Sequence, residues 1–275
     1  MIPAPWRFGA CLVAALCVGC ATAPRVLPPE LQALPAIVLL GEVHDNAAQH
    51  ALRLRAFEAL LATGARPALA MEQFDRERQP QIDQVLAATP RPNADALIAA
   101  GAGRNPWEWS FYRPFVALAL QHGLPIIAAN VSRDDARQVM RQGLAATGFD
   151  DRVPDTMLQA HARGIEDSHC GAIDGATARR MALAQVARDQ FMARIVEAQA
   201  RRGVVLLAGN GHVRTDLGAP FWLSPRTRAR GVAIGLLEDG DTTLNYDRVV
   251  FTAPQPRPDP CAAMAPKQAA SAPAR

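Results

Sequence analysis

The 275-residue chain has few aromatic residues, few cysteines and little net charge. Its formal charge is +3 and its Arg residues are spread along the sequence, so electrostatics give no support to nucleic-acid binding. The five cysteines do not show the spaced pattern of a disulfide framework. Hydrophobic residues nevertheless make up 49% of the chain, which is enough for the core of one α/β domain.

The N-terminus resembles a bacterial secretory signal that ends in a lipidation site. Arg7 precedes an apolar stretch from Phe8 to Val18, which is too short to span a bilayer. The stretch runs into Cys17-Val18-Gly19-Cys20, which resembles a lipobox although Cys17 stands where Leu is usual. We therefore expect residues 1–19 to be a signal peptide and Cys20 to be acylated, so that lipid anchors the protein to the bacterial envelope with its domain facing the periplasm. The alternatives are an ordinary secretory signal and an uncleaved anchor.

The segments that flank the domain are rich in Pro. Residues 20–35 are expected to carry the lipid and to act as a tether. Residues 252–275 are rich in Pro and Ala, so we expect a disordered, dispensable tail. Because the signal and the lipid account for the first three cysteines, only Cys170 and Cys261 remain, and Cys261 lies in this tail. No disulfide is therefore indicated, and the domain is expected over residues 36–251.

Short apolar runs alternate with helical patterns along the domain. This alternation predicts an α/β fold with a mainly parallel sheet flanked by helices on both faces. Asp239-Gly240 indicates a turn, and therefore a final antiparallel hairpin. The expected strands are Ile37–Gly41, Ala68–Met71, Leu124–Ala129, Val204–Ala208, Gly231–Leu237 and Asp247–Phe251, and the expected helices cover 47–63, 80–88, 115–121, 133–141 and 177–202.

Polar clusters follow three of the expected strands. Glu42 and His44 follow the first, Glu72 follows the second, and His212 follows the run that ends at Gly209. The carboxyl ends of parallel strands share one edge, where ligands bind, so these side chains should lie together. Two imidazoles and two carboxylates would suit zinc, iron or manganese, or general acid–base catalysis. The alternative is that they only cap helices and brace loops.

A local concentration of aromatic residues suggests a different ligand. Five aromatic residues fall between positions 107 and 115, with Arg113 among them: Trp107, Trp109, Phe111, Tyr112 and Phe115. A haem needs an apolar slot, an axial ligand such as His or Tyr, and cations near its propionates, so Tyr112 could ligate the iron. The alternatives are a helix start packed on the core and a surface for self-association.

Four motifs together resemble the ChaN-like haem-binding uptake lipoproteins of the Tiki superfamily. The resemblance covers roughly residues 36–223 and implies a haem-binding envelope protein for iron uptake, with haem held between the subunits of a homodimer. The wider superfamily also contains metal-dependent proteases and erythromycin-esterase-like hydrolases. The motifs are Leu40-Gly41-Glu42-Val43-His44-Asp45-Asn46, His169-Cys170-Gly171, Ala184-Gln185-Val186-Ala187-Arg188-Asp189 and Leu207-Ala208-Gly209-Asn210-Gly211-His212-Val213-Arg214.

The resemblance adds His169 and Arg214 to Tyr112 and Arg113 as expected haem contacts. We therefore expect a haem-binding lipoprotein, with haem as cofactor and a divalent metal as a second possible ligand. A metal-dependent hydrolase that uses the Glu and His cluster is the first alternative function. A tethered interaction module without enzymatic activity is the second.

Overall fold

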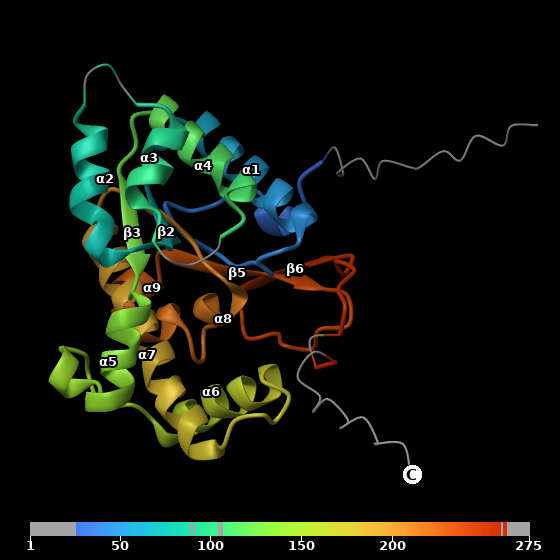
Figure 1. The fold of residues 1–275 in the computed structure, drawn as a ribbon. Coiled ribbons are helices and arrows are strands. Elements are labelled where there is room, and N and C mark those ends of the chain that lie inside the picture. The colour runs from blue at the N-terminus through green and yellow to red at the C-terminus, as the bar shows by residue number, and fades with distance from the viewer. Residues whose placement is uncertain (1–25, 89, 91, 104–106, 260, 263–275) are drawn as a thin grey trace, which may run out of the picture.

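The computed structural model describes residues 26–262 apart from 89, 91, 104–106 and 260. Its centre is a six-stranded sheet in the order β3-β2-β4-β1-β5-β6, and every neighbouring pair is parallel (Figure 1). This confirms the predicted parallel α/β fold. The strands are β1 (Ile37–Leu40), β2 (Ala68–Asp75), β3 (Ile126–Asn130), β4 (Val204–Leu207), β5 (Gly231–Glu238) and β6 (Arg248–Thr252).

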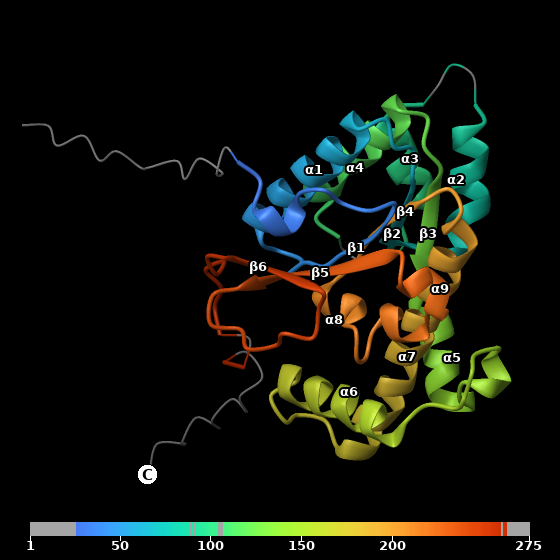
Figure 2. The same ribbon diagram turned by 180° about the vertical axis from the view of Figure 1, so that it is seen from behind.

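Alternating side chains of the strands build a core on each face of the sheet. In β1, Val38 and Leu40 belong to one hydrophobic cluster, whereas Ile37 and Leu39 belong to the other. The first cluster is covered by the four helices that precede β3, as Figures 1 and 2 show from opposite sides. These helices are α1 (Ala47–Ala62), α2 (Gln79–Leu86), α3 (Ala94–Gly101) and α4 (Trp109–Gln121).

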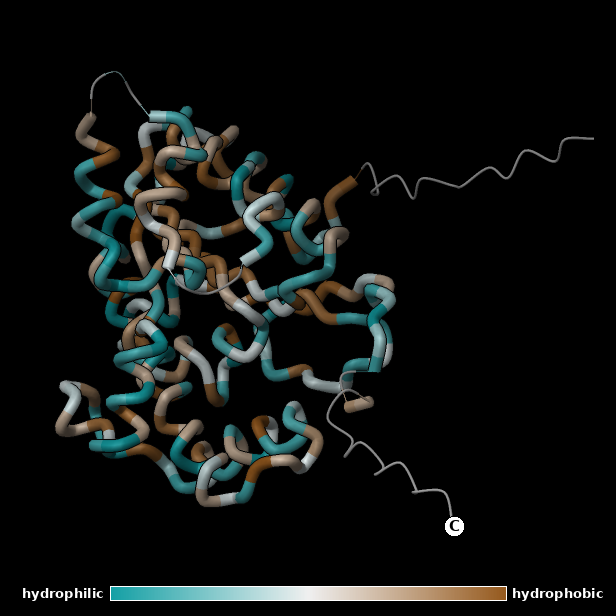
Figure 3. Tube along the Cα trace, in the orientation of Figure 1, coloured by the Kyte–Doolittle hydropathy of each residue, from teal (hydrophilic) through white to brown (hydrophobic). Residues whose placement is uncertain are grey.

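The later helices cover the other face in two layers. The longest helix, α7, packs against the sheet, and α5 and α6 pack on α7 on the side away from the sheet. The hydropathy trace in Figure 3 is brown along much of the central strands, in keeping with their burial. These helices are α5 (Arg133–Gln142), α6 (Asp155–Ser168), α7 (Gly175–Gln199), α8 (Asn210–Val213) and α9 (Pro225–Arg228), with 3-10 turns at Pro29–Leu31, Arg76–Arg78, Ala145–Thr147 and Ala219–Trp222.

The predicted antiparallel final hairpin is wrong. Gly240 does turn the chain, with φ +97°, but the chain then returns to the start of β5 before β6 begins. There the Asp247 N–H donates to the Ala233 carbonyl at 2.9 Å. The connection is therefore long enough to reset the strand direction, and β6 adds in parallel to β5.

The prediction of a disordered tail from residue 252 onward also needs correction for residues 252–259, 261 and 262, which the structure describes. Thr252 belongs to β6, and the residues that follow it lie against the domain. Cys261 forms a disulfide with Cys170, with 5.6 Å between the Cα atoms, which the composition of the tail did not indicate. Residues 263–275, and the signal and lipidation site at residues 1–20, lie outside the described residues. None of the helices in the described part of the chain has the length and apolar character needed to cross a membrane.

Candidate functional site

The motifs Leu40–Asn46 and Leu207–Arg214 meet where β1 and β4 end, as their positions in the sequence predicted. The Asn210 N–H donates to the Glu42 carbonyl at 2.9 Å, which ties the turn after β4 to the turn after β1. The Asn210 side chain then pairs with the backbone of Leu236 in β5. This approach requires glycine at position 41, since a Cβ there would lie 2.2 Å from Asn210 Oδ1.

Glu42 is the centre of a buried polar network. Its Oε1 accepts hydrogen bonds from the Tyr112 hydroxyl at 2.5 Å and from His44 Nδ1 at 2.8 Å. Its Oε2 forms an ion pair with Arg53 of α1, whose side chain is fully buried. His50, one turn earlier in α1, donates from Nε2 to the His44 carbonyl at 2.9 Å and so braces the same loop.

The protonation states of this network follow from burial. Burial lowers the pKa of Arg53 to about 10, so the guanidinium stays charged at neutral pH and keeps Glu42 ionised. Burial also raises the pKa of Tyr112 above its ordinary value, so its phenol stays neutral and donates. Because the Glu42 carboxylate can only accept, His44 must carry its hydrogen on Nδ1.

His44 is therefore held through Nδ1, with its second ring nitrogen turned away from Glu42. Its side chain is 47% exposed, and no described residue bonds to its Nε2. The ring lies close over Gly209, where a Cβ would be 3.0 Å from Nε2. A carboxylate that orients a histidine through one nitrogen while the other faces outward is the usual support of a histidine that binds metal.

The second half of the site is built differently around His212. Its Nδ1 lies 2.6 Å from Asp189 Oδ1, and its Nε2 lies 3.6 Å from Glu72 Oε1. Glu72 lies in β2 beyond the last pair with β4, where the register with β3 shifts, and its Oε2 accepts from the Gly209 N–H at 2.7 Å. Asp189, in α7, is completely buried.

The two carboxylates favour the charged form of His212. Burial alone would lower the pKa of His212, but the charges of Asp189 and Glu72 outweigh it and raise the pKa above the ordinary value. Burial would likewise raise the pKa of Glu72, but the His212 and His44 imidazoles and the Gly209 N–H lower it. His212 is therefore held between the two carboxylates, with a hydrogen bond to Asp189 at 2.6 Å and an ion-pair contact to Glu72 at 3.6 Å.

A cleft of about 520 Å³ opens beside both histidines, within the size range of ligand sites, roughly 300–1,000 Å³. Helix α6 forms the opposite wall, and its His161 reaches back to Asp189, with 3.8 Å between Nε2 and Oδ2. Arg214 is the one Arg or Lys among the described lining residues. The lining comprises Glu42, Val43, His44, Ala160, His161, Gly164, Ile165, Ser168, Gln185, Gly209, Asn210, Gly211, His212, Arg214, Leu217 and Asp241.

The other predicted haem contacts lie in different environments. Tyr112 faces Glu42 in the core, not the cleft, and packs between Trp107 and Trp109. Arg113 lies on the outer side of α4, where it pairs with Asp95 at 2.6 Å. His169 ends α6, and its Nδ1 bonds to the Ile165 carbonyl at 2.7 Å. Arg214 lines the cleft while it pairs with Asp216 at 2.7 Å.

The aromatic segment is thus the start of a helix packed on the core, one of the three interpretations that its sequence allows. The Glu and His cluster does share one edge, as predicted, but its members do not converge on one point. Among the described residues, no group of three or more His, Cys, Asp or Glu side chains is arranged to hold a metal ion.

Sequence reasoning missed two residues that complete the site, Arg53 and His161, and it quoted Asp189 in a motif without assigning it a role. Arg53 follows Gln49 and precedes Phe57 by four residues, so it lies on the buried face of α1. A charge on such a face needs an opposite charge nearby, and that signal was present in the sequence. His161 carries no comparable signal, because α6 itself was not predicted.

Comparisons with known proteins agree with this architecture. Over 77% of this chain and 85% of the other, the structure titled "Cofacial heme binding to ChaN of Campylobacter jejuni" is similar, with a TM-score of 0.65 and 21% identity. An erythromycin esterase, EreC, in its open conformation gives a TM-score of 0.46 at 13% identity, over 79% of this chain and 76% of that one. RRSP, a toxin effector domain from Vibrio vulnificus, gives 0.41 at 15% identity, over 79% and 37%.

A search of curated proteins finds no match to this chain. The sequence model described as "Haem-binding uptake, Tiki superfamily, ChaN" matches residues 33–223, which is more than half of the chain and includes Glu42, His44, Glu72 and His212. The chain therefore belongs to the haem-binding uptake family of the Tiki superfamily, the family of ChaN.

Proposed function

We propose that the protein binds haem in the cleft beside α6, with His44 as the residue that holds the iron. The single observation that carries this assignment is the Glu42–His44 pair, which presents Nε2 half-exposed and without a described partner. The haem supplies an iron that accepts this nitrogen. The protein supplies the orientation of the ring, through Glu42 and the close support of Gly209.

The lining of the cleft supports a flat, largely apolar ligand with acidic groups. Ala160, Ile165 and Leu217 offer apolar contact, and the glycines of the opposite wall leave room for close approach. Arg214 is the cation placed to pair with a propionate. This assignment replaces three of the haem contacts expected from the sequence. The Tyr112 hydroxyl donates its hydrogen bond to Glu42, and neither Arg113 nor His169 lines the cleft.

Spectra of haemin titrations test this assignment. We expect His44→Ala to lose the axial bond, weaken haemin binding and shift the Soret band, since no other described imidazole nitrogen in the cleft is equivalently presented. Tyr112→Phe should keep the parent spectrum, because the phenol does not face the cleft. His169→Ala, outside the cleft lining, is the matched control. A spectrum that changes with Tyr112→Phe and not with His44→Ala would contradict the assignment.

We further propose that this binding serves haem or iron uptake at the bacterial envelope, with Cys20 as the lipid anchor. The lipobox-like sequence supports this, and so does the Cys170–Cys261 disulfide, because disulfides persist mainly in oxidising compartments such as the periplasm. Cys20→Ser should move the protein from the membrane fraction to a soluble or unprocessed form. Unchanged fractionation with a cleaved signal would exclude lipidation at Cys20.

The hydrolase alternative and the homodimer stay predictions. The hydrolase residues share the cleft, but the charged His212 is engaged by two carboxylates, which does not favour it as a base or a metal ligand. Metal analysis of the purified protein tests the hydrolase alternative, and light scattering with and without haemin tests the homodimer. A protein that binds neither haemin nor stoichiometric metal would leave the tethered interaction module.

A further inference from the structure

The segment after β6 is fixed to the loop that carries His44. We call residues 253–259 and 261 the C-terminal strap. Arg257 pairs with Asp45 at 2.6 Å, one residue after His44, and with Glu238 at 2.7 Å. Asn46 Nδ2 also donates to the Ala253 carbonyl at 3.0 Å. The first half of the strap is therefore joined to the β1 side of the cleft.

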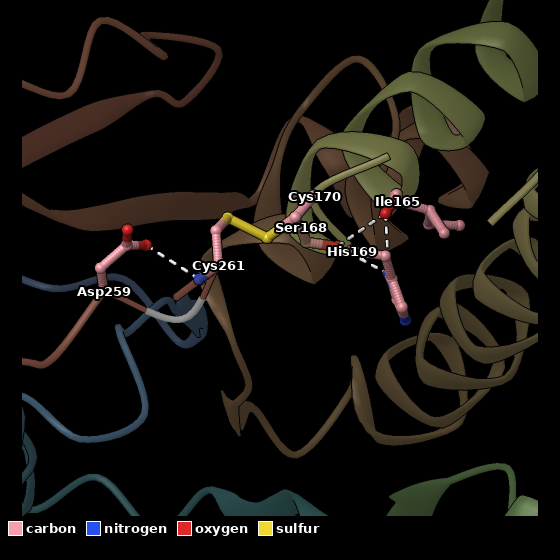
Figure 4. The surroundings of a disulfide bond; sticks show 6 residues. All are labelled: Ile165, Ser168, His169, Cys170, Asp259 and Cys261. Carbon is pink, nitrogen blue, oxygen red and sulfur yellow. Dashed lines mark hydrogen bonds between the residues drawn. A yellow bond between two sulfur atoms is a disulfide. The ribbon is translucent and has the colours of Figure 1, made fainter. Parts of the chain in front are cut away.

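The far end of the strap is joined to the opposite side of the cleft. Cys261 is bonded to Cys170, and its N–H donates to Asp259 Oδ1 at 2.8 Å (Figure 4). Cys170 lies in the turn that follows α6, two residues after the helix ends at Ser168. Because α6 forms the outer wall of the cleft, the disulfide is a covalent connection between the two walls.

The other contacts at that end of α6 are few: Ile173 packs against the core beside α7, and backbone hydrogen bonds such as that from the Gly171 N–H to the Glu166 carbonyl close the turn. The buried side chains of α6 are Met157, Leu158 and Ile165, so the last of them lies three residues before the end of the helix. None of the residues from 166 to 175 is buried. Cys170 itself has φ +55°, which is unusual for a residue other than glycine. The turn therefore depends on its covalent partner for its position more than on packing.

We propose that the Cys170–Cys261 disulfide is a redox-sensitive tie that controls the width of the cleft. When it is oxidised, the strap holds the end of α6 toward the His44 loop. A dithiol reductant attacks the exposed Cys261 side of the bond, forms a mixed disulfide with it and releases Cys170 as a thiolate, which takes up a proton. The second thiol of the reductant then closes its own disulfide and releases Cys261 as a thiol. Two electrons pass from the reductant to the protein, and the end of α6 is released.

The identity of the ligand in this proposal rests on the proposed function, but the movement of α6 does not. Reduction should therefore have two separate consequences. Hydrogen exchange should accelerate at the end of α6 and the following turn, by about tenfold or more as a held segment becomes a loosely held one. Haemin bound in the cleft should also leave faster, because the wall that covers it is free to move.

The test compares the full-length protein with a variant that carries both Cys170→Ser and Cys261→Ser. Exchange at Asp155–Ser168 is measured by mass spectrometry with and without tris(2-carboxyethyl)phosphine, with α1 as an internal reference. Haemin dissociation is followed by transfer to apomyoglobin. We expect the reduced parent to match the double variant in both measurements, and the double variant to be insensitive to reductant.

Two results would overturn the proposal: exchange in α6 that is the same in the oxidised parent, the reduced parent and the double variant, or a response to reductant that persists without the two cysteines. Arg257→Gln keeps the disulfide and removes the ion pairs at the other end, so it should produce part of the same loosening. If the parent does not bind haemin at all, the proposed function fails while the exchange measurement still decides the role of the disulfide.

Discussion

The buried pair of Glu42 and Arg53 should be among the most sensitive points of the domain. Glu42→Gln preserves the shape of the side chain but leaves the Arg53 guanidinium without a counter-charge, in a position where that side chain is 0% exposed. Loss of one partner of a buried ion pair costs about 3–5 kcal/mol. For a domain of this size that corresponds to a fall in Tm of about 6–20 °C.

Urea denaturation followed by circular dichroism measures this loss. Glu58→Gln, on the exposed side of the same helix α1 that carries Arg53, is the matched control and should change stability by no more than about 0.5 kcal/mol. Arg53→Met in the Glu42→Gln background should recover part of the loss, because it removes the uncompensated charge. A Glu42→Gln variant that loses less than about 1 kcal/mol, or a double variant as unstable as the sum of the singles, would refute the reasoning.

Two further predictions concern the turn after β4. Gly209→Ala should displace the His44 ring, whose Cε1 would lie 2.9 Å from the new Cβ, and should weaken haemin binding and cost about 1–3 kcal/mol, whereas Gly211→Ala meets nothing within 4 Å and serves as the control. Because the pKa of His212 is higher in the folded protein than its unfolded value near 6.5, protonation of His212 should stabilise the fold. This stabilisation should be complete at pH values below 6.5 and should be lost as the pH rises through the folded pKa. Urea midpoints between about pH 6 and 9 should fall more steeply in the parent than in His212→Gln, and parallel slopes would contradict the assignment.

The sequence was sufficient for the sheet and for the edge that carries the site. Apolar runs followed by polar motifs located Glu42 and His212 just after strands, and a parallel sheet brings such ends to one edge whatever the order of its strands. Glu72 joins them from inside β2, which continues to Asp75 and does not end at Met71 as predicted. The roles of the residues were harder to predict. Tyr112 was expected to face a ligand because aromatic residues are scarce, but burial of its ring and the demand of Glu42 for a donor place its hydroxyl inside.

The helix α7 shows why side-chain partners escape such reasoning. Within the expected helix 177–202, apolar residues from Leu183 to Ala198 are spaced for a single buried stripe, but the face that is buried runs through Val186, Asp189 and Ala193. A rotation of about one residue separates the two stripes, and both contain enough apolar residues to look plausible. The disulfide was missed for another reason: its cysteines are 91 residues apart, and composition gave no indication of the path that joins them.

The two histidines of the site show how one residue type takes two roles in the same cleft. Each is held through Nδ1 by a carboxylate, at 2.8 Å for His44 and 2.6 Å for His212. The difference lies at Nε2, where His212 meets Glu72 and His44 meets no described side chain. The second carboxylate occupies the surroundings of His212 Nε2, whereas the Nε2 of His44 faces the cleft without a described partner. The position of Glu72 therefore decides which imidazole braces the turn after β4, and it leaves His44 as the histidine that our proposal assigns to the iron.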